Sequence, residues 1–199
     1  MSEALPVIHL ARHGETEWSI SGQYTGHTDL PLTLRGELNA RALGQRLRGL
    51  VFARVLASPL QRALRTCELA GFGAAAEIDP DLTEWDYGLY EGRHPAEIQA
   101  ERPDWDLFRD GCPGGESVDQ IAARADRVVG RLRAVKGAVL VFSSGHFLRV
   151  LAARCLGLDV ACGRYLVLGT ASLSVLGHGQ HSPAEPAIEL WNDTSHVQT

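Results

Sequence analysis

The stretch AVLVFSSGHFLRVLAARCL, residues 138–156, decides how this chain is expected to fold. Its first five residues are apolar and read as a buried strand, and a small polar turn follows at 143–146. Apolar residues then recur in a helical pattern from Phe147 to Leu156. A strand that passes through a short turn into a helix is the repeating unit of parallel α/β sheets. Ligands in such folds bind where the strands end, so the turn is a candidate site edge.

Four more short runs read as strands. Two come early, at 7–11 (VIHLA) and 54–57 (RVLA), and two come late, at 171–176 and 187–191. Because strands alternate with helical patterns, the expected fold is a three-layer α/β/α sandwich with a mostly parallel central sheet. The length fits a single domain over residues 1–199.

Two helices are expected between the early strands and the middle of the chain. Thr33 can cap a helix that reaches about Leu50, and Ser58 with Pro59 can cap and open another, to about Ala70. The spacing of apolar residues predicts one buried face on the first of them. That face would hold Leu34, Leu38, Ala42, Leu43 and Leu47.

The segment at 79–116 is rich in Asp, Pro, Gly and aromatic residues, and only one short helix, at 95–101, is expected in it. A long irregular insertion in a compact domain is usually functional, for example a lid or a substrate-facing loop. After it, Ser117 and Gln120 form a capping-box signature for a helix to about Ala134.

The composition limits the partners. The formal net charge is −5, from 19 Lys and Arg against 24 Asp and Glu, which disfavours nucleic acid and anionic membranes as partners. Any bound anion must therefore meet a local cluster of Arg and His. The four cysteines show no zinc-ligand spacing, so no metal site is expected. With no signal peptide and no run of about 20 apolar residues, a cytoplasmic location is expected.

A charged pair followed by glycine, Arg12-His13-Gly14, ends the strand at 7–11. Burial of these groups is costly unless a partner compensates them. Arginine offers a planar fork of donors that matches phosphate oxygens, and histidine offers a neutral nitrogen nucleophile at physiological pH. Taken alone, such a triplet more often marks a hydrogen-bonded histidine and a solvated arginine.

Two further residues add weight to this triplet. Arg62 lies four residues beyond Ser58, one turn into the next helix, so it can point toward the same edge as Arg12; the alternative is a surface arginine. Glu84 lies among the aromatic residues of LTEWDYGLYEG (82–92). Aromatic surroundings favour a protonated carboxyl group, which would make Glu84 a proton donor.

Together these segments resemble the histidine phosphatase superfamily, also called phosphoglycerate-mutase-like. They occur in the order typical of that family and cover most of residues 7–156. The sequences of residues 17–33 and 108–112 are most similar to a branch of small acid and sugar-phosphate phosphatases that includes sedoheptulose-bisphosphatase-like proteins. The matching segments are LARHGETEW (10–18), SGQYTGHTDLPLT (21–33), ASPLQRALRT (57–66), LTEWDYGLYEG (82–92), FRDGCPGGES (108–117) and VFSSGHFLRVLAAR (141–154).

The resemblance implies a catalytic set of four residues. His13 would attack the phosphorus and become a transient phosphohistidine, and Arg12 and Arg62 would clamp the phosphoryl oxygens. Glu84 would protonate the departing alkoxide and then activate water. Fixed guanidinium charges supply what Mg²⁺ supplies in other phosphoryl-transfer sites, so no metal and no cofactor are expected.

The resemblance also implies a substrate pocket for a small phosphorylated metabolite. Thr25, Gly26 and Tyr87 match pocket-lining positions, and Ser19 stands where many members have Asn. For Ser19 and Thr25, ordinary hydrogen bonding within the loop is an equally good interpretation. The oligomeric state is left open, and a homo-oligomer is among the alternatives.

The turn departs from the family pattern. The family has S-H-G, or in this branch S-H-G-H, where this chain has Ser143-Ser144-Gly145-His146. Ser144 therefore stands in the position of the second catalytic histidine, and it can donate a hydrogen bond but carries no positive charge. His146 matches the branch's later histidine and could cap the helix, line the pocket or contact phosphate.

The function expected from these residues is slow, metal-independent hydrolysis of a sugar or glycolytic phosphate. A phosphoglycerate mutase and a phosphate-binding pseudoenzyme are the alternatives. A Ser-His-Asp hydrolase built on Ser144 would lack the G-x-S-x-G elbow and would leave Arg12, Arg62 and Glu84 unexplained.

Overall fold

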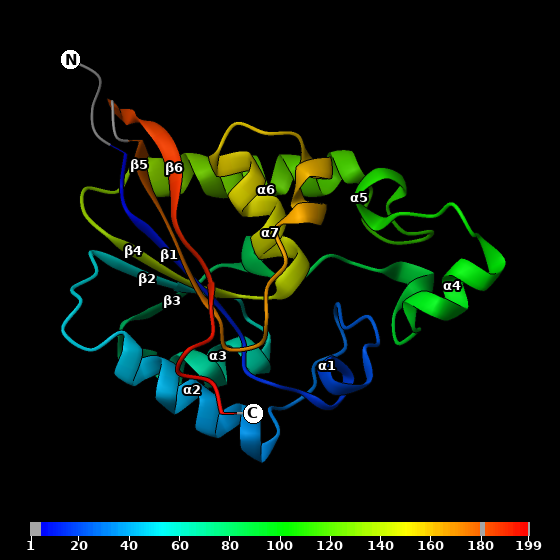
Figure 1. Cartoon of the computed structure of the whole chain (residues 1–199), viewed down its shortest axis with the longest axis horizontal. Coiled ribbons are helices and arrows are strands. Elements are labelled where there is room, and N and C mark those ends of the chain that lie inside the picture. The colour runs from blue at the N-terminus through cyan, green and yellow to red at the C-terminus, as the bar shows by residue number, and fades with distance from the viewer. Residues whose placement is uncertain (1–4, 180–181, 199) are drawn as a thin grey trace.

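The computed structural model describes residues 5–179 and 182–198; the remaining positions of the expected 1–199 domain lie outside the described residues. A six-stranded sheet forms the centre, in the order β3-β2-β4-β1-β5-β6 (Figure 1). The first four strands of this order are mutually parallel, while β5 is antiparallel to β1 and β6 is antiparallel to β5. The strands are β1 (Ile8–Arg12), β2 (Arg54–Ala57), β3 (Ala76–Ile78), β4 (Val139–Ser143), β5 (Leu173–Gly179) and β6 (Ser182–Asp193).

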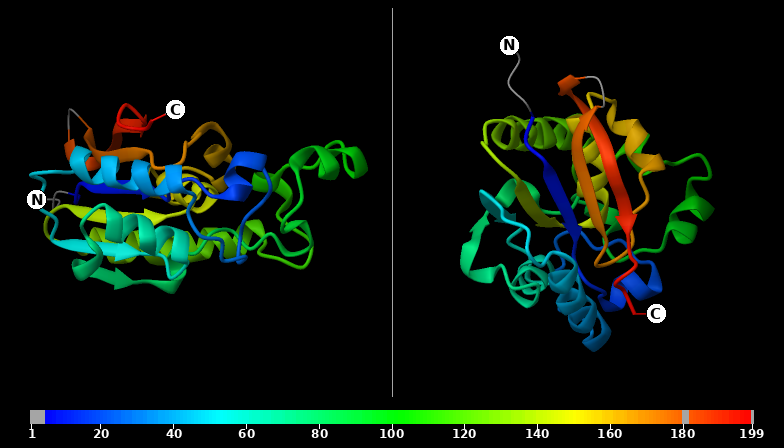
Figure 2. Two further views of the ribbon diagram at one scale, coloured as in Figure 1. Left: turned by 90° about the horizontal axis from the view of Figure 1, so that it is seen from below. Right: turned by 60° about the vertical axis from the view of Figure 1, so that its left-hand side comes forward.

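Helices cover both faces of this sheet (Figure 2). Successive side chains of β4 point to opposite faces: Val139 and Val141 pack in the core under α6 and α7, and Leu140 and Phe142 pack in the core under α2 and α3. The mostly parallel three-layer α/β/α architecture is thus confirmed. The helices are α1 (Glu17–Ser21), α2 (Leu34–Arg46), α3 (Gln61–Leu69), α4 (Pro95–Glu101), α5 (Leu107–Asp110), α6 (Val118–Arg133) and α7 (Gly145–Cys155). Among the described residues, no helix has both the length and the apolar character needed to cross a bilayer.

The buried face of α2 differs from the expected one. Thr33 caps the helix as predicted, but α2 ends at Arg46 rather than near Leu50, and Leu34 and Leu38 are 85% and 54% exposed. The reason lies in Gly36, where an added Cβ would come within 2.2 Å of the Glu15 carbonyl oxygen. Because α2 lies this close to the loop after β1, the helix face that packs against the protein carries small residues. The buried residues of α2 are Gly36, Asn39, Ala40 and Leu43.

The start of α3 also differs. Ser58 is buried and extends the sheet, because its N–H donates to the Phe142 carbonyl at 2.9 Å, and it does not cap the helix. The helix begins at Gln61, whose N–H donates to the Asp29 carboxylate at 2.8 Å. A side chain from a distant loop therefore supplies the acceptor at this helix end, which local sequence patterns do not reveal.

The segment at 79–116 is more regular than expected. It contains the predicted helix α4, but also α5 and two 3₁₀ turns. Helix α5 has only four residues, too few to show a periodic pattern, and Asp106 caps it by accepting the Phe108 N–H at 2.9 Å. The capping box of Ser117 and Gln120 opens α6 as predicted.

Candidate active site

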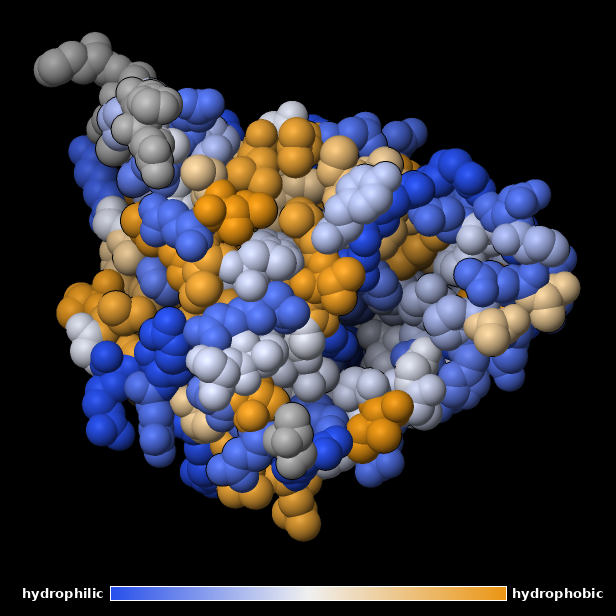
Figure 3. Space-filling model, in the orientation of Figure 1, coloured by the Kyte–Doolittle hydropathy of each residue, from blue (hydrophilic) through white to orange (hydrophobic). Residues whose placement is uncertain are grey.

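The carboxyl ends of three parallel strands meet at one edge of the sheet. The register pairs Arg12 of β1 with Ser143 of β4, and Ala57 of β2 with Phe142 of β4. A cleft of about 240 Å³ opens at this edge, and Figure 3 shows the surface hollowed between the body of the protein and the lobe that carries α4. The predicted residues that line it are Arg12, His13, Ser19, Thr25, Glu84, Tyr87 and His146.

His13 is held as a neutral nucleophile. Its Nδ1 lies 2.7 Å from the Gly14 carbonyl oxygen, which can only accept, so Nδ1 carries the proton and Nε2 keeps its lone pair. Burial lowers the pKa of His13 well below its usual value, and the neighbouring cations Arg62 and Arg12 lower it further. The imidazole is therefore unprotonated at neutral pH and can attack an electrophile.

The guanidinium of Arg12 lies against the first turn of α7. Its Nη1 donates to the Leu168 carbonyl at 2.5 Å, and a Cβ added at Gly145 would lie 3.1 Å from its Nε. Burial lowers the pKa of Arg12, and the nearby Glu84 carboxylate opposes this shift. Gly145 thus leaves the space that the guanidinium occupies.

Arg62 lies fully buried behind the cleft lining. Its Nη1 donates to the Thr28 carbonyl at 3.0 Å, and its Nη2 donates to the carbonyls of Thr25 and Gly26 at 3.1 and 2.8 Å. These three bonds hold the terminal nitrogens of the guanidinium. Only Nε is left without a partner among the described residues.

The loop that holds Arg62 is itself held by Glu91. The Glu91 carboxylate accepts the Gly26 N–H at 2.9 Å and the Thr28 N–H at 3.0 Å. A Cβ added at Gly26 would lie 2.6 Å from this carboxylate, so glycine is needed there. Gly26, expected to line the pocket, instead supports Arg62 from behind the cleft lining.

The buried polar atoms that lack a hydrogen-bond partner among the described residues include Nε of Arg12, Nε of Arg62 and Oγ of Ser144. Ser144 is adjacent to His13, because the His13 N–H donates to the carbonyl of Ser143, the preceding residue. Buried polar groups in proteins are nearly always paired. Three donors from separate chain segments, beside a nucleophilic imidazole, suit a tetrahedral oxyanion.

Backbone amides hold the Glu84 carboxylate. Its Oε1 accepts the N–H groups of Trp85 and Phe147 at 2.8 and 2.7 Å, and its Oε2 accepts the His146 N–H at 2.9 Å. Two of these donors are first-turn amides of α7. All three bonds fix the place of the carboxylate beside the cleft.

His146 lies in the first turn of α7, which starts two residues earlier than predicted. Its Nδ1 is 2.6 Å from the Tyr87 hydroxyl. Burial lowers the pKa of His146 well below its usual value, with help from Arg149 and Arg12, and burial raises the pKa of Tyr87 well above its usual value. Both groups are therefore neutral, and His146 does not supply the positive charge that Ser144 lacks.

Ser19 and Thr25 line the cleft but are already engaged within their loops. The Ser19 hydroxyl donates to the Thr16 carbonyl and accepts the Thr16 N–H, both at 2.8 Å. The Thr25 hydroxyl donates to the Gln23 carbonyl at 3.2 Å. These contacts match the loop-bonding interpretation, and both side chains remain within reach of a bound molecule.

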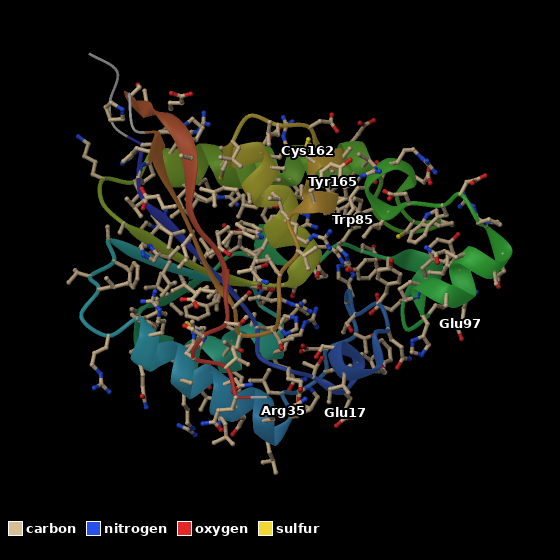
Figure 4. All side chains as sticks on the ribbon, in the orientation of Figure 1. Glu17, Arg35, Trp85, Glu97, Cys162 and Tyr165 are labelled. Carbon is tan, nitrogen blue, oxygen red and sulfur yellow. The ribbon has the colours of Figure 1, made fainter. Side chains whose placement is uncertain are left out.

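Glu15 joins the loop after β1 to α2. Its carboxylate accepts the Thr33 hydroxyl at 2.6 Å and Nε of Arg35 at 2.8 Å, and it forms an ion pair with the same guanidinium. Figure 4 shows Arg35 at the start of α2, beside the segment that leads into α1. The hydrogen bond from Arg35 lowers the pKa of Glu15. This contact fixes the loop that carries His13.

Tyr24 and Arg149 are among the cleft-lining residues that sequence reasoning missed. Tyr24 packs 4.6 Å from the Tyr87 ring, centroid to centroid, and burial raises its pKa to about 12. Arg149 donates to the carbonyls of Gly163 and Arg164 at 2.9 and 2.8 Å. Its spacing from His146, one helical turn, was an available signal, because residues three apart share a helix face.

The cleft at the edge of this α/β sandwich thus holds a neutral histidine beside buried arginines. The chain belongs to the histidine phosphatase superfamily (branch 1), whose family model matches residues 8–194.

Individual relatives agree with this assignment. An acid phosphatase of Mycobacterium tuberculosis is 41% identical over 176 residues, which cover 85% of this chain and 86% of that protein. A sedoheptulose 1,7-bisphosphatase of Saccharomyces cerevisiae is 33% identical over an alignment of 255 residues, which covers 96% of this chain and 94% of that protein. The solved structure of an open reading frame product of Mycobacterium tuberculosis superimposes with a TM-score of 0.87 at 36% identity, covering 94% of this chain and 97% of that chain.

Proposed function

We propose that this protein is a metal-independent phosphatase that hydrolyses a small phosphomonoester, a sugar or glycolytic phosphate, through a phosphohistidine on His13. The observation that carries the proposal is the neutral His13 with a free Nε2, beside three unpartnered donors. Membership of the superfamily and the phosphatase-named relatives support hydrolysis of small phosphates.

In the first step, Nε2 of His13 forms a bond to phosphorus while the bond from phosphorus to the ester oxygen breaks. The guanidinium groups of Arg12 and Arg62 stabilise the charge that builds on the phosphoryl oxygens. Glu84 enters this step protonated and gives its proton to the leaving alkoxide.

In the second step, Glu84 acts as a carboxylate. It takes a proton from a water molecule, whose oxygen forms a bond to phosphorus as the bond to His13 breaks. Inorganic phosphate leaves, and both His13 and the protonated Glu84 return to their starting states. The charge of two fixed guanidinium groups serves both steps.

Ser144 is the residue that sets the rate in this proposal. Its Oγ contributes one neutral donor where the family has an imidazole, and the neighbouring His146 is neutral as well. Loss of one transition-state donor typically lowers turnover by about 10²–10³ fold. Slow turnover is the consequence.

The test is hydrolysis of p-nitrophenyl phosphate in the presence of EDTA by three chains that differ only at position 144. We expect Ser144→His to exceed the native chain by about a hundredfold, and Ser144→Ala to fall below it. The alanine variant should fold at least as stably, because the Ser144 hydroxyl has no partner to lose. If Ser144→His hydrolyses the ester no faster than the native chain, the assignment of Ser144 to the phosphate pocket is wrong.

The same serine favours one alternative, a phosphate-binding pseudoenzyme. In that case all three chains would be inert in single-turnover assays, while isothermal titration would still detect inorganic phosphate. A mutase would instead interconvert phosphoglycerates without release of inorganic phosphate.

A further inference from the structure

We propose that Arg124, paired with Glu116, is a positioning residue for Glu84. The pair holds the Glu84 carboxyl group where it can transfer a proton to the leaving group. This inference rests on the proposed role of Glu84. Arg124 lies on α6, 40 residues further along the chain, and it borders a different surface hollow, with His27 and Gln120. It therefore acts through Glu84 and not on the substrate.

The guanidinium of Arg124 is nearly buried, and every one of its five N–H groups has a partner. Two of them form a fork to the Glu116 carboxylate, at 2.8 Å from Nε and 2.6 Å from Nη2. The other three donate to backbone carbonyls of the segment that carries Glu84. These acceptors are Asp81 at 2.8 Å, Thr83 at 2.7 Å and Glu84 at 3.2 Å.

The same guanidinium also contacts a residue whose backbone binds the Glu84 carboxyl group. It stacks on the Phe147 ring at 4.3 Å from the ring centre, and the Phe147 N–H donates to Glu84 Oε1 at 2.7 Å. Arg124 thus touches both the backbone that carries Glu84 and the residue that receives its side chain.

Glu116 completes this arrangement. Its carbonyl accepts the Trp85 indole N–H at 2.8 Å, and its N–H donates to the Asp86 carbonyl at 2.9 Å. Lysine cannot replace Arg124, because an ammonium group has three donors and no planar fork. We expect Arg124→Lys to leave carbonyls or Glu116 unpaired and to let Glu84 move.

The readout is the dependence on the leaving group. A p-nitrophenolate leaves without a proton, whereas an alkoxide needs one, so misplacement of the acid slows an alkyl ester selectively. The measured quantity is kcat/KM for glycerol 2-phosphate and for p-nitrophenyl phosphate, since it reports the step in which the alcohol departs. Glu84→Gln is the reference and should lose about a hundredfold more on the alkyl ester.

We expect Arg124→Lys to lose at least tenfold more on the alkyl ester than on the nitrophenyl ester. Adding it to Glu84→Gln should widen that difference no further. The matched control is Arg127→Lys on the same helix. Among the described residues, the Arg127 guanidinium forms hydrogen bonds only to the Asp81 carboxylate, so this change should leave both esters unaffected. Equal losses on both esters would overturn the inference.

A second variant and a second measurement keep the inference testable if Arg124→Lys does not fold. Glu116→Gln should produce the same selective loss if Arg124→Lys fails to fold. Amide hydrogen exchange at His146 and Phe147 reports the position of the Glu84 carboxylate independently of any activity assay, because both amides donate to it. We expect faster exchange in Glu116→Gln and no change in Arg127→Lys; unchanged exchange would contradict the inference. If Glu84→Gln itself shows no preference between esters, the proposed function fails instead.

Discussion

The imidazole Nδ1 of His13 lies 2.7 Å from the carbonyl oxygen of Gly14. Because that contact places the proton on Nδ1, the phosphoryl group must go to Nε2. We predict that rapid alkaline quenching during turnover traps phosphohistidine substituted at Nε2, identified by ³¹P NMR of the peptide digested at alkaline pH. A phosphoryl group on Nδ1, or on Ser144, would contradict this geometry. His13→Gln, which lacks the nucleophile, is the control.

The depressed pKa of His13 predicts a loss of stability in acid. The folded protein binds this proton less readily than the unfolded chain does, so the free energy of unfolding decreases as the pH falls below about 6.5. The slope is at most about 1.4 kcal/mol per pH unit for each such group, and His146 adds to it. Urea unfolding between pH 7 and pH 5 measures this dependence. In His13→Asn the slope should be shallower; an identical slope would refute the assignment.

Gly145→Ala tests the space that Arg12 occupies. The added Cβ would lie 3.1 Å from Nε of Arg12, so the guanidinium must shift by a few tenths of an ångström. We expect kcat/KM for p-nitrophenyl phosphate to fall about tenfold, because misplacement by 1 Å can cost about a hundredfold.

The matched control for that variant is Gly130→Ala on α6, where an added Cβ meets nothing within 4 Å. It should leave activity unchanged and raise stability by about 1 kcal/mol, the usual gain of alanine over glycine inside a helix. If Gly145→Ala keeps the kcat/KM of the native chain, Arg12 tolerates the shift and the prediction is wrong.

Glu91→Gln should weaken phosphate binding through Arg62. The amide keeps one acceptor oxygen for the loop N–H groups but loses the charge that strengthens both bonds. We expect the KM for p-nitrophenyl phosphate to rise several fold. In an Arg62→Lys background the same change should have almost no further effect, since both act on one guanidinium. Additive losses in this double-mutant cycle would mean that Glu91 supports the fold alone.

Local patterns predicted the elements that local interactions determine. Strand 54–57, helix 95–101 and the cap at Thr33 follow from neighbours in the sequence, and the structure has them. The acceptor at the start of α3 comes instead from Asp29, and the buried face of α2 follows from its contact with the Glu15 backbone. Tertiary contacts of this kind override propensity and spacing.

The site shows the same division. Arg12, His13 and Arg62 could be predicted to meet, because the carboxyl ends of neighbouring parallel strands converge on one edge. Glu91 and Arg124 could not, since each acts on backbone groups more than 30 residues away and carries no local signal. The contacts that hold the Glu84 carboxylate could not be predicted either, because two of them come from first-turn amides of α7.

Glu84 is held by backbone amides at residues 146 and 147, not by side chains. The identity of the residue at 144 or 146 is therefore irrelevant to that anchor. Substitutions in this turn can therefore change the reactivity of the site during evolution, while the backbone contacts keep Glu84 in position and preserve the shape of the cleft.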